Sequence, residues 1–199
     1  MKVIGITGGV GAGKSEVITY IGNNTNSIII KADNLAHDLE KKGMPAYLEL
    51  VKLLGSEILG EDGEINKAKF ANAIFVDSTG EILSKVNQII HPIVKKYICD
   101  VIETERTRNF VDFIFIEAAL LIEDGYDKIC DELWYIYASE ETRRARLKDS
   151  RGYSDEKISG IFKKQNSEAI FRQYCIKEIN NDGSIEDMHK SVDEILNIK

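Results

Sequence analysis

The segment VIGITGGVGAGKS, residues 3–15, joins a short apolar, β-branched run to a glycine-rich loop. The apolar run ends at Thr7, and residues 14–21 follow the loop with helical character. A run of this kind before a glycine cluster is typical of a strand, and glycines punctuate the chain between regular elements. We therefore expect a strand, a glycine loop and a helix in that order.

The loop from Gly8 to Ser15 fits the pattern G-x-x-x-x-G-K-[S/T] without adjustment. Glycines in this pattern let successive backbone N–H groups surround a phosphate chain, and the following helix adds the positive end of its dipole. Lys14 is expected to bridge the β- and γ-phosphates of a nucleotide, and the Ser15 hydroxyl to complete the coordination of Mg²⁺. The alternative is a plain glycine turn, which the flanking strand and helix disfavour.

Four further apolar runs alternate with longer helical segments. They span residues 27–30, 110–116, 133–137 and, most weakly, 176–179. Near-continuous apolar runs are typical of parallel strands that are covered on both faces. The alternation therefore predicts an α/β fold around a parallel sheet.

Residues 34–107 are mostly helical in pattern and form a candidate second lobe. Pro92 lies inside this stretch and is expected to kink or divide a helix. Ser139 and Ser184 each precede a helical pattern and are expected to act as N-caps.

The composition excludes several classes of protein. The chain has 199 residues and a formal net charge of −7, which opposes sequence-independent binding to nucleic acid and gives no attraction to an anionic membrane surface. No apolar stretch approaches the roughly 18 to 20 residues that span a bilayer, so we expect a cytoplasmic protein. Cys99, Cys130 and Cys175 show no C-x-x-C spacing and are expected to be buried, reduced thiols.

Two carboxylates end apolar runs and are candidates for chemistry. Asp33 follows the run at residues 27–30, where it is suited to accept the proton of a hydroxyl during phosphoryl transfer. Its alternative is an N-cap for the helix from Asn34 onward. Glu117 follows the run at 110–116 and is placed to orient a magnesium shell. Its alternative is an ordinary carboxylate at a strand end.

Four arginines lie close together at Arg143, Arg144, Arg146 and Arg151. Arg143 and Arg146 share a helix face, and planar guanidinium groups neutralise the charge of a transferring phosphoryl group. The cluster therefore suits a closing lid, although a solvated helix face is the commoner meaning of such a run.

These features, read in order, resemble the dephospho-CoA kinase family along nearly the whole chain. The matching segments are GITGGVGAGKS at 5–15, KADNLAH at 31–37, IIHP at 89–92, ALLIE at 119–123, residues 143–147 with Gln165, and INNDG at 179–183. Ala119 stands where the family usually has proline, Glu117 where aspartate is common, and Ser150-Arg151 where Arg-Asp is usual.

The resemblance implies a three-layer P-loop NTPase fold with a five-stranded parallel sheet. Residues 1–33, 108–139 and 174–199 would form the core, 34–107 a helical substrate-binding insert, and 140–173 a lid and its following helix. The implied activity is ATP- and Mg²⁺-dependent phosphorylation of the ribose 3′-hydroxyl of dephospho-CoA. No nucleic acid or membrane partner is implied, and a monomer is expected.

The resemblance also implies a set of site residues. Asp33, Lys14 and Arg146 would be catalytic. The ATP-binding set would be Gly8, Gly9, Gly11, Ala12, Gly13, Lys14, Ser15, Glu16 and Asn181, with Asn181 beside the adenine. The acceptor would contact Leu35, His37, His91 and Glu123. Ser15 would meet magnesium through ATP, and Glu117 through water.

Two rival functions remain open. A nucleoside monophosphate kinase of the same fold would need a basic site near the second strand, where Asp33 stands instead. A nucleotide-dependent switch specific for guanine would carry Asn-Lys-x-Asp, but residues 66–69 read NKAK.

Overall fold

The computed structural model describes residues 1–118 and 120–197, so Ala119 of the ALLIE segment lies outside the described residues. The chain forms two units, which are described separately. The core unit comprises Met1–Ile30 and Glu105–Lys199, and the helical unit comprises Lys31–Thr104. A lid that is separate from the core stays a prediction.

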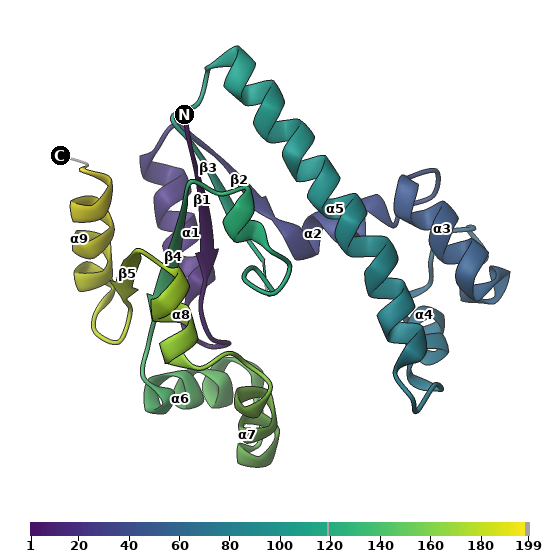
Figure 1. Cartoon of the computed structure of the whole chain (residues 1–199). Coiled ribbons are helices and arrows are strands. Elements are labelled where there is room, and N and C mark those ends of the chain that lie inside the picture. Colours follow the sequence, from purple (N-terminus) through teal and green to yellow (C-terminus); the bar gives the residue numbers. More distant parts are fainter. Residues whose placement is uncertain (119, 198–199) are drawn as a thin grey trace. The chain divides into compact units, whose positions relative to one another are not determined.

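A five-stranded sheet organises the fold (Figure 1). Its strands are β1 (Lys2–Thr7), β2 (Ser27–Lys31), β3 (Phe113–Glu117), β4 (Glu132–Tyr137) and β5 (Lys177–Asn180), in the order β2-β3-β1-β4-β5. Strand β1 pairs in parallel with β3 and β4, and β4 pairs in parallel with β5. The predicted α/β fold with a five-stranded sheet is therefore confirmed.

The third strand begins later than its apolar run suggested. Phe110 was expected to start it, but β3 begins at Phe113, and the Phe110 side chain is 76% exposed. The three residues Ile114, Phe115 and Ile116 are fully buried, because helices cover this part of the sheet on both faces.

Helices pack on both faces of the sheet. Trp134 and Ile136 of β4 belong to the same buried cluster as apolar residues of α1 (Lys14–Asn24) and α9 (Ile185–Leu196). The alternate residue Tyr135 stacks on Phe171 of α8 (Glu168–Tyr174), with ring centroids 4.9 Å apart. Since successive side chains of a strand point to opposite faces, α8 covers the face opposite to α1 and α9.

Two predicted N-caps are confirmed. The Ser139 side chain accepts a hydrogen bond from the Thr142 N–H at the start of α6 (Glu140–Arg151). Ser184 begins α9 and forms a capping box with Asp187. Helix α7 (Asp155–Lys163) lies between α6 and α8, and a short 3₁₀ turn spans Tyr126–Lys128.

The helical unit contains four helices and a 3₁₀ turn. They are α2 (Ala32–Leu39), α3 (Pro45–Leu54), the turn at Ser56–Ile58, α4 (Lys67–Phe75) and most of α5 (Glu81–Arg108). Helix α5 runs unbroken past Pro92 (Figure 1), so of the two expected effects, a kink or a division of the helix, the division was wrong and the kink stays a prediction. Proline removes a single backbone donor, and the buried side chains of Val86, Val94 and Ile98 hold both halves of the helix in place.

The sequence also predicted buried, reduced cysteines and no segment able to span a bilayer. None of the three cysteines forms a disulfide, and each is only partly buried, so the prediction that they are buried was wrong. Within the part of the chain that the structure describes, no helix combines the length and apolarity needed to cross a membrane.

Candidate nucleotide-binding site

The glycine loop lies at the carboxyl edge of the sheet, directly after β1. Ile6 is aligned with Glu117 of β3 on one side and with Trp134 of β4 on the other. From β1 the chain runs to β2 on one side of the sheet, whereas from β4 it runs to β5 on the other. Ligands of open α/β sheets bind where connections diverge in this way, so the loop occupies the expected place for a ligand.

Glycine is required at several positions of the loop by its backbone geometry. Gly11 and Gly13 have φ values of 85° and 86°, a left-handed conformation that L side chains rarely adopt. At Gly8 a Cβ would come within 2.5 Å of the Ile136 carbonyl oxygen. Gly13 also precedes α1 without any side-chain cap, so the first N–H groups of this helix are open to a ligand.

Lys14 folds back over the loop. Its Nζ donates to the carbonyl oxygens of Gly8 at 2.7 Å and Gly9 at 3.4 Å. Ser15 and Glu16 follow at the start of α1, and both are exposed. The arrangement places an ammonium group and the start of a helix beside the same loop.

Asn181 and Arg146 bind the end of the loop. The Asn181 side chain is buried and donates from Nδ2 to the Ala12 carbonyl oxygen at 2.8 Å. Arg146 donates from Nη2 to the Asn181 carbonyl oxygen at 2.9 Å and from Nη1 to the Ala12 carbonyl oxygen at 3.5 Å. The loop, α6 and the turn after β5 are thereby joined, and two residues predicted from distant segments lie together.

Asp182, which sequence reasoning missed, ties that turn to the start of α6. Its Oδ1 accepts from the Ser139 N–H at 2.9 Å and from the Ser139 hydroxyl at 2.8 Å. The hydrogen bond from Thr142 and those from Ser139 hold the pKa of Asp182 below its ordinary value. Its position between Asn181 and the glycine turn is the only signal in the sequence.

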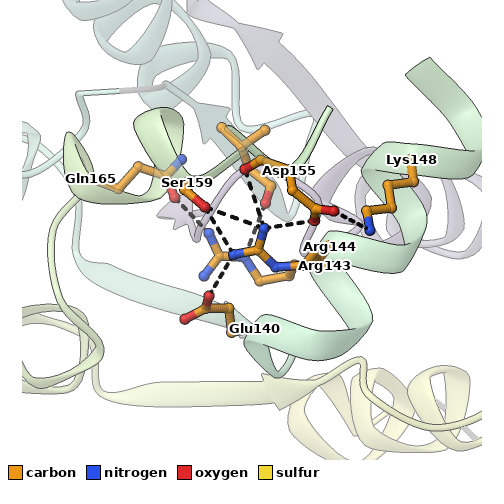
Figure 2. A network of polar contacts seen from close by, with 8 residues as sticks. Glu140, Arg143, Arg144, Lys148, Asp155, Ser159 and Gln165 are labelled. Carbon is orange, nitrogen blue, oxygen red and sulfur yellow. Dashed lines mark hydrogen bonds and ion pairs between the residues drawn. The ribbon is translucent and has the colours of Figure 1, made fainter. Parts of the chain in front are cut away.

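Arg143 and Arg144, two other arginines of the cluster, have different partners (Figure 2). Arg143 donates from Nε to the Val10 carbonyl oxygen at 3.0 Å, so it also lies on the loop. Arg144 instead contacts Glu140 at 2.9 Å and Asp155 at 3.1 Å, and it bonds Ser159 at 3.3 Å. Arg144 therefore fastens α7 to α6, a structural role that the sequence pattern did not distinguish from phosphate binding.

Glu117 and Ser15 are suited to a hydrated Mg²⁺ held through phosphates. Glu117 is half-buried at the end of β3, the strand that pairs with β1. The Ser15 hydroxyl is exposed at the start of α1. Hydroxyl and carboxylate oxygens are the donors that Mg²⁺ prefers, together with water and phosphate. Within residues 1–118 and 120–197, no three His, Cys, Asp or Glu side chains gather as a metal site of their own. The residues present fit a magnesium ion that arrives with a nucleotide.

Asp33 is the second residue of α2 and is exposed. The helix begins at Ala32, its N-cap is Lys31, and no side chain caps it, so the alternative of Asp33 as an N-cap was wrong. The Asp33 carboxylate makes no hydrogen bond with other residues of the helical unit that the structure describes.

The predicted acceptor residues are distributed over both units. Leu35 and His37 lie on α2, where His37 Nδ1 is 3.3 Å from Glu40 Oε2. His91 lines a groove of about 450 Å³ along one face of α5. Glu123 belongs to the core unit and accepts a hydrogen bond from Asn166 Nδ2 at 2.7 Å. Their shared role in acceptor binding stays a prediction.

The fold and the loop define a P-loop kinase: a parallel sheet in this strand order, with the glycine loop, Lys14 and Ser15 after its central strand. The chain belongs to the dephospho-CoA kinase family, because the family model of that description matches residues 2–187.

Individual relatives agree with this assignment. A dephospho-CoA kinase of Aquifex aeolicus is 37% identical and one of Streptococcus mutans 34% identical, each alignment covering 98% of this chain and 96% of the relative. The crystal structure of a Thermus thermophilus protein has a TM-score of 0.78 at 26% identity and covers 98% of this chain and 96% of its own.

Proposed function

We propose that this protein transfers the γ-phosphoryl group of ATP to the ribose 3′-hydroxyl of dephospho-CoA, giving coenzyme A and ADP. Membership of the family and a P-loop with all its motif residues support the reaction class. The observation that carries the proposal is the loop itself, with Lys14 beside Gly8 and Gly9 and the uncapped first turn of α1 following Gly13.

ATP binding would use this loop as a cradle for the phosphates. The backbone N–H groups of Gly9, Gly11, Ala12 and Gly13 and the first turn of α1, with Ser15 and Glu16, would surround the phosphate chain. Lys14 would leave the Gly8 carbonyl oxygen for the β- and γ-phosphate oxygens, where an ammonium group gains a much stronger, charge-assisted partner. Asn181, beside Gly13, would border the adenine.

Ser15 would complete the coordination of a magnesium ion that arrives with ATP, and Glu117 would hold that ion through water. The ion, when bound with ATP, supplies charge neutralisation for the phosphoryl oxygens. Arg146 would add a second positive charge on the transferring group, because it lies on the loop carbonyl of Ala12. Positioning and electrostatics supply most of the acceleration in such reactions.

Asp33 would accept the proton of the 3′-hydroxyl as the bond to phosphorus forms. Asp33 is exposed at the start of α2 and does not cap the helix, so its carboxylate is available for a substrate hydroxyl. Leu35, His37, His91 and Glu123 would contact dephospho-CoA. A monomer in the cytoplasm stays the expectation from the sequence.

Initial rates of ADP release separate this reaction from its rivals. The protein is incubated with MgATP and dephospho-CoA, with MgATP and nucleoside monophosphates, and with MgATP alone. We expect strong stimulation by dephospho-CoA only. Stimulation by a monophosphate would favour a nucleotide kinase, and equal rates in all three reactions would leave a switch or a simple ATPase.

A further inference from the structure

The guanidinium group of Arg143 lies directly on the backbone of the P-loop. A Cβ built on Gly9 would collide with the guanidinium carbon and with both Nη atoms of Arg143. At Gly11 a Cβ would come within 2.9 Å of the Arg143 carbonyl oxygen. Arg143 of α6 therefore occupies the space that side chains at positions 9 and 11 of the loop would need.

Three contacts fix the orientation of this guanidinium, of which Figure 2 shows the one with Gln165. Its Nε donates to the Val10 carbonyl oxygen at 3.0 Å, and its Nη2 donates to Gln165 Oε1 at 2.6 Å. The ring of Phe162 lies 4.2 Å from the guanidinium carbon. Because the guanidinium is a rigid planar fork, hydrogen bonds at two of its edges and a ring against its face leave it one orientation. Phe162 and Gln165 belong to the end of α7 and the segment after it, so that segment holds a side chain of α6 in place.

Arg143 forms no direct ion pair with a carboxylate within the described residues. Its Nη1 donates no hydrogen bond to any residue of 1–118 or 120–197. Its neighbour Arg144 differs, because Glu140 and Asp155 both contact that guanidinium. Burial lowers the pKa of Arg143 below its ordinary value by disfavouring the charged form, while the nearby Tyr135, Glu140 and Glu168 act in the opposite direction. An anion on the loop would remove this penalty.

We propose that Arg143 contacts the phosphates of the bound nucleotide and that Gln165 is the residue that positions it. A neutral amide is suited to this role, since Gln165 fixes the guanidinium without neutralising its charge. A carboxylate at position 165 would accept the same hydrogen bond but would pair with the cation and repel a phosphate. The inference rests on the proposed function only in taking ATP as the ligand.

The test measures ATP and adenosine affinity by calorimetry for Arg143→Gln, Arg143→Lys, Gln165→Glu and wild type. Arg143→Gln and Gln165→Glu should each weaken ATP binding by about tenfold or more, the loss expected for a charge-assisted contact, and leave adenosine affinity unchanged. Arg143→Lys should retain part of the ATP affinity, because the charge remains and the fork is lost. The matched control is Gln173→Glu, which makes the same change of charge at an exposed position of α8 and should bind ATP like wild type.

Two results would overturn the proposal. Wild-type ATP affinity in Gln165→Glu and in every folded Arg143 variant would mean that Arg143 does not contact the phosphates. Equal loss of ATP and adenosine affinity would mean that the pair only supports the fold of the loop. Thermal unfolding identifies a variant that fails to fold. If the Arg143 variants fail to fold, the ATP affinity of Gln165→Glu shows whether Arg143 contacts the phosphates. No acceptor is present in these measurements, so a failure to phosphorylate dephospho-CoA would refute the proposed function and leave this inference standing.

Discussion

The side-chain amide of Asn181 donates a hydrogen bond to the carbonyl oxygen of Ala12 across 2.8 Å, and both residues are buried. Asn181 follows β5 and Ala12 follows β1, so the bond joins segments 169 residues apart in sequence. It fixes the last part of the glycine loop immediately before α1. The shape of the loop therefore depends on a turn near the other end of the chain.

Asn181→Ala should destabilise the protein by about 1–3 kcal/mol, because it leaves the buried Ala12 carbonyl oxygen with only the longer bond from Arg146. Urea unfolding measures this free energy. Asn24→Ala is the matched control, since it removes a bond of equal length, 2.8 Å, at an exposed position. The control should lose no more than about 0.5 kcal/mol. Equal losses in the two variants would show that burial of the Asn181 bond contributes nothing.

Gly13→Ala should destabilise the protein through two separate effects. Its φ of 86° is strained for alanine, and the new Cβ would displace Asn181 Nδ2 from its bond to Ala12. Gly43 has nearly the same φ, 85°, but nothing lies within 4 Å of its Cβ position. Gly43→Ala should therefore cost about 1–2 kcal/mol, from backbone strain alone.

A double-mutant cycle separates these two effects. In the Asn181→Ala background, the cost of Gly13→Ala should fall toward that of Gly43→Ala, because the colliding side chain is gone. Urea unfolding of the four proteins gives the coupling energy. Strict additivity would show that the collision with Asn181 is not what makes glycine necessary at position 13.

Asp33→Asn should lower kcat by about 10²–10⁴, because the amide cannot accept the hydroxyl proton, while the affinity for ATP stays within about twofold of wild type. The matched control is Asp38→Asn on the same helix, which breaks only an exposed ion pair with Lys41 at 2.6 Å. Steady-state kinetics and a separate binding measurement give the two quantities. Unchanged kcat in Asp33→Asn would remove this residue from the proposed mechanism.

Lowering the pH should destabilise the start of α5, because it protonates the carboxylate of Asp77. Its carboxylate accepts hydrogen bonds from the Ile82 N–H at 2.8 Å and the Thr79 N–H at 2.9 Å. These bonds lower its pKa from 3.8 to about 2. A depressed folded-state pKa contributes stability above the unfolded-state pKa, and the contribution is lost as the pH falls from about 4 toward 2.

Asp77→Asn tests this contribution. The variant should be less stable than wild type at pH 7, and its stability should fall less steeply between pH 4 and 2. Urea unfolding at several pH values measures both effects. A variant whose stability curve runs parallel to wild type over this interval would show that Asp77 does not carry this part of the pH dependence.

The sheet and the loop could be predicted because their signals are local in sequence. Apolar runs mark strands that are covered on both faces, and the glycine, lysine and serine of the loop are contiguous. Phe110 extended one run beyond its strand, because apolarity alone does not distinguish a covered strand from an exposed approach to it. Pro92 was expected to kink or divide α5; the helix is not divided, because the packing of Val86 and Val94 on either side of Pro92 outweighs one lost hydrogen bond.

The different partners of the neighbouring arginines could not be predicted, for a different reason. Arg143 and Arg144 are adjacent and chemically identical, and their roles depend on partners further along the chain. Gln165 lies 22 residues after Arg143, and Asp155 lies 11 residues after Arg144. Arg144 meets Asp155, and Arg143 meets Gln165, only because α7 and the segment after it pack against α6. No residue spacing in the sequence predicts this packing.

The most direct test of the proposed function determines where the phosphoryl group goes. The protein is incubated with MgATP and dephospho-CoA, and phosphorus NMR of the isolated product locates the new phosphate on the ribose. We predict a 3′-phosphate formed in equal amount to ADP. A phosphate on the 2′-hydroxyl, or ADP formed with no phosphorylated dephospho-CoA, would contradict it.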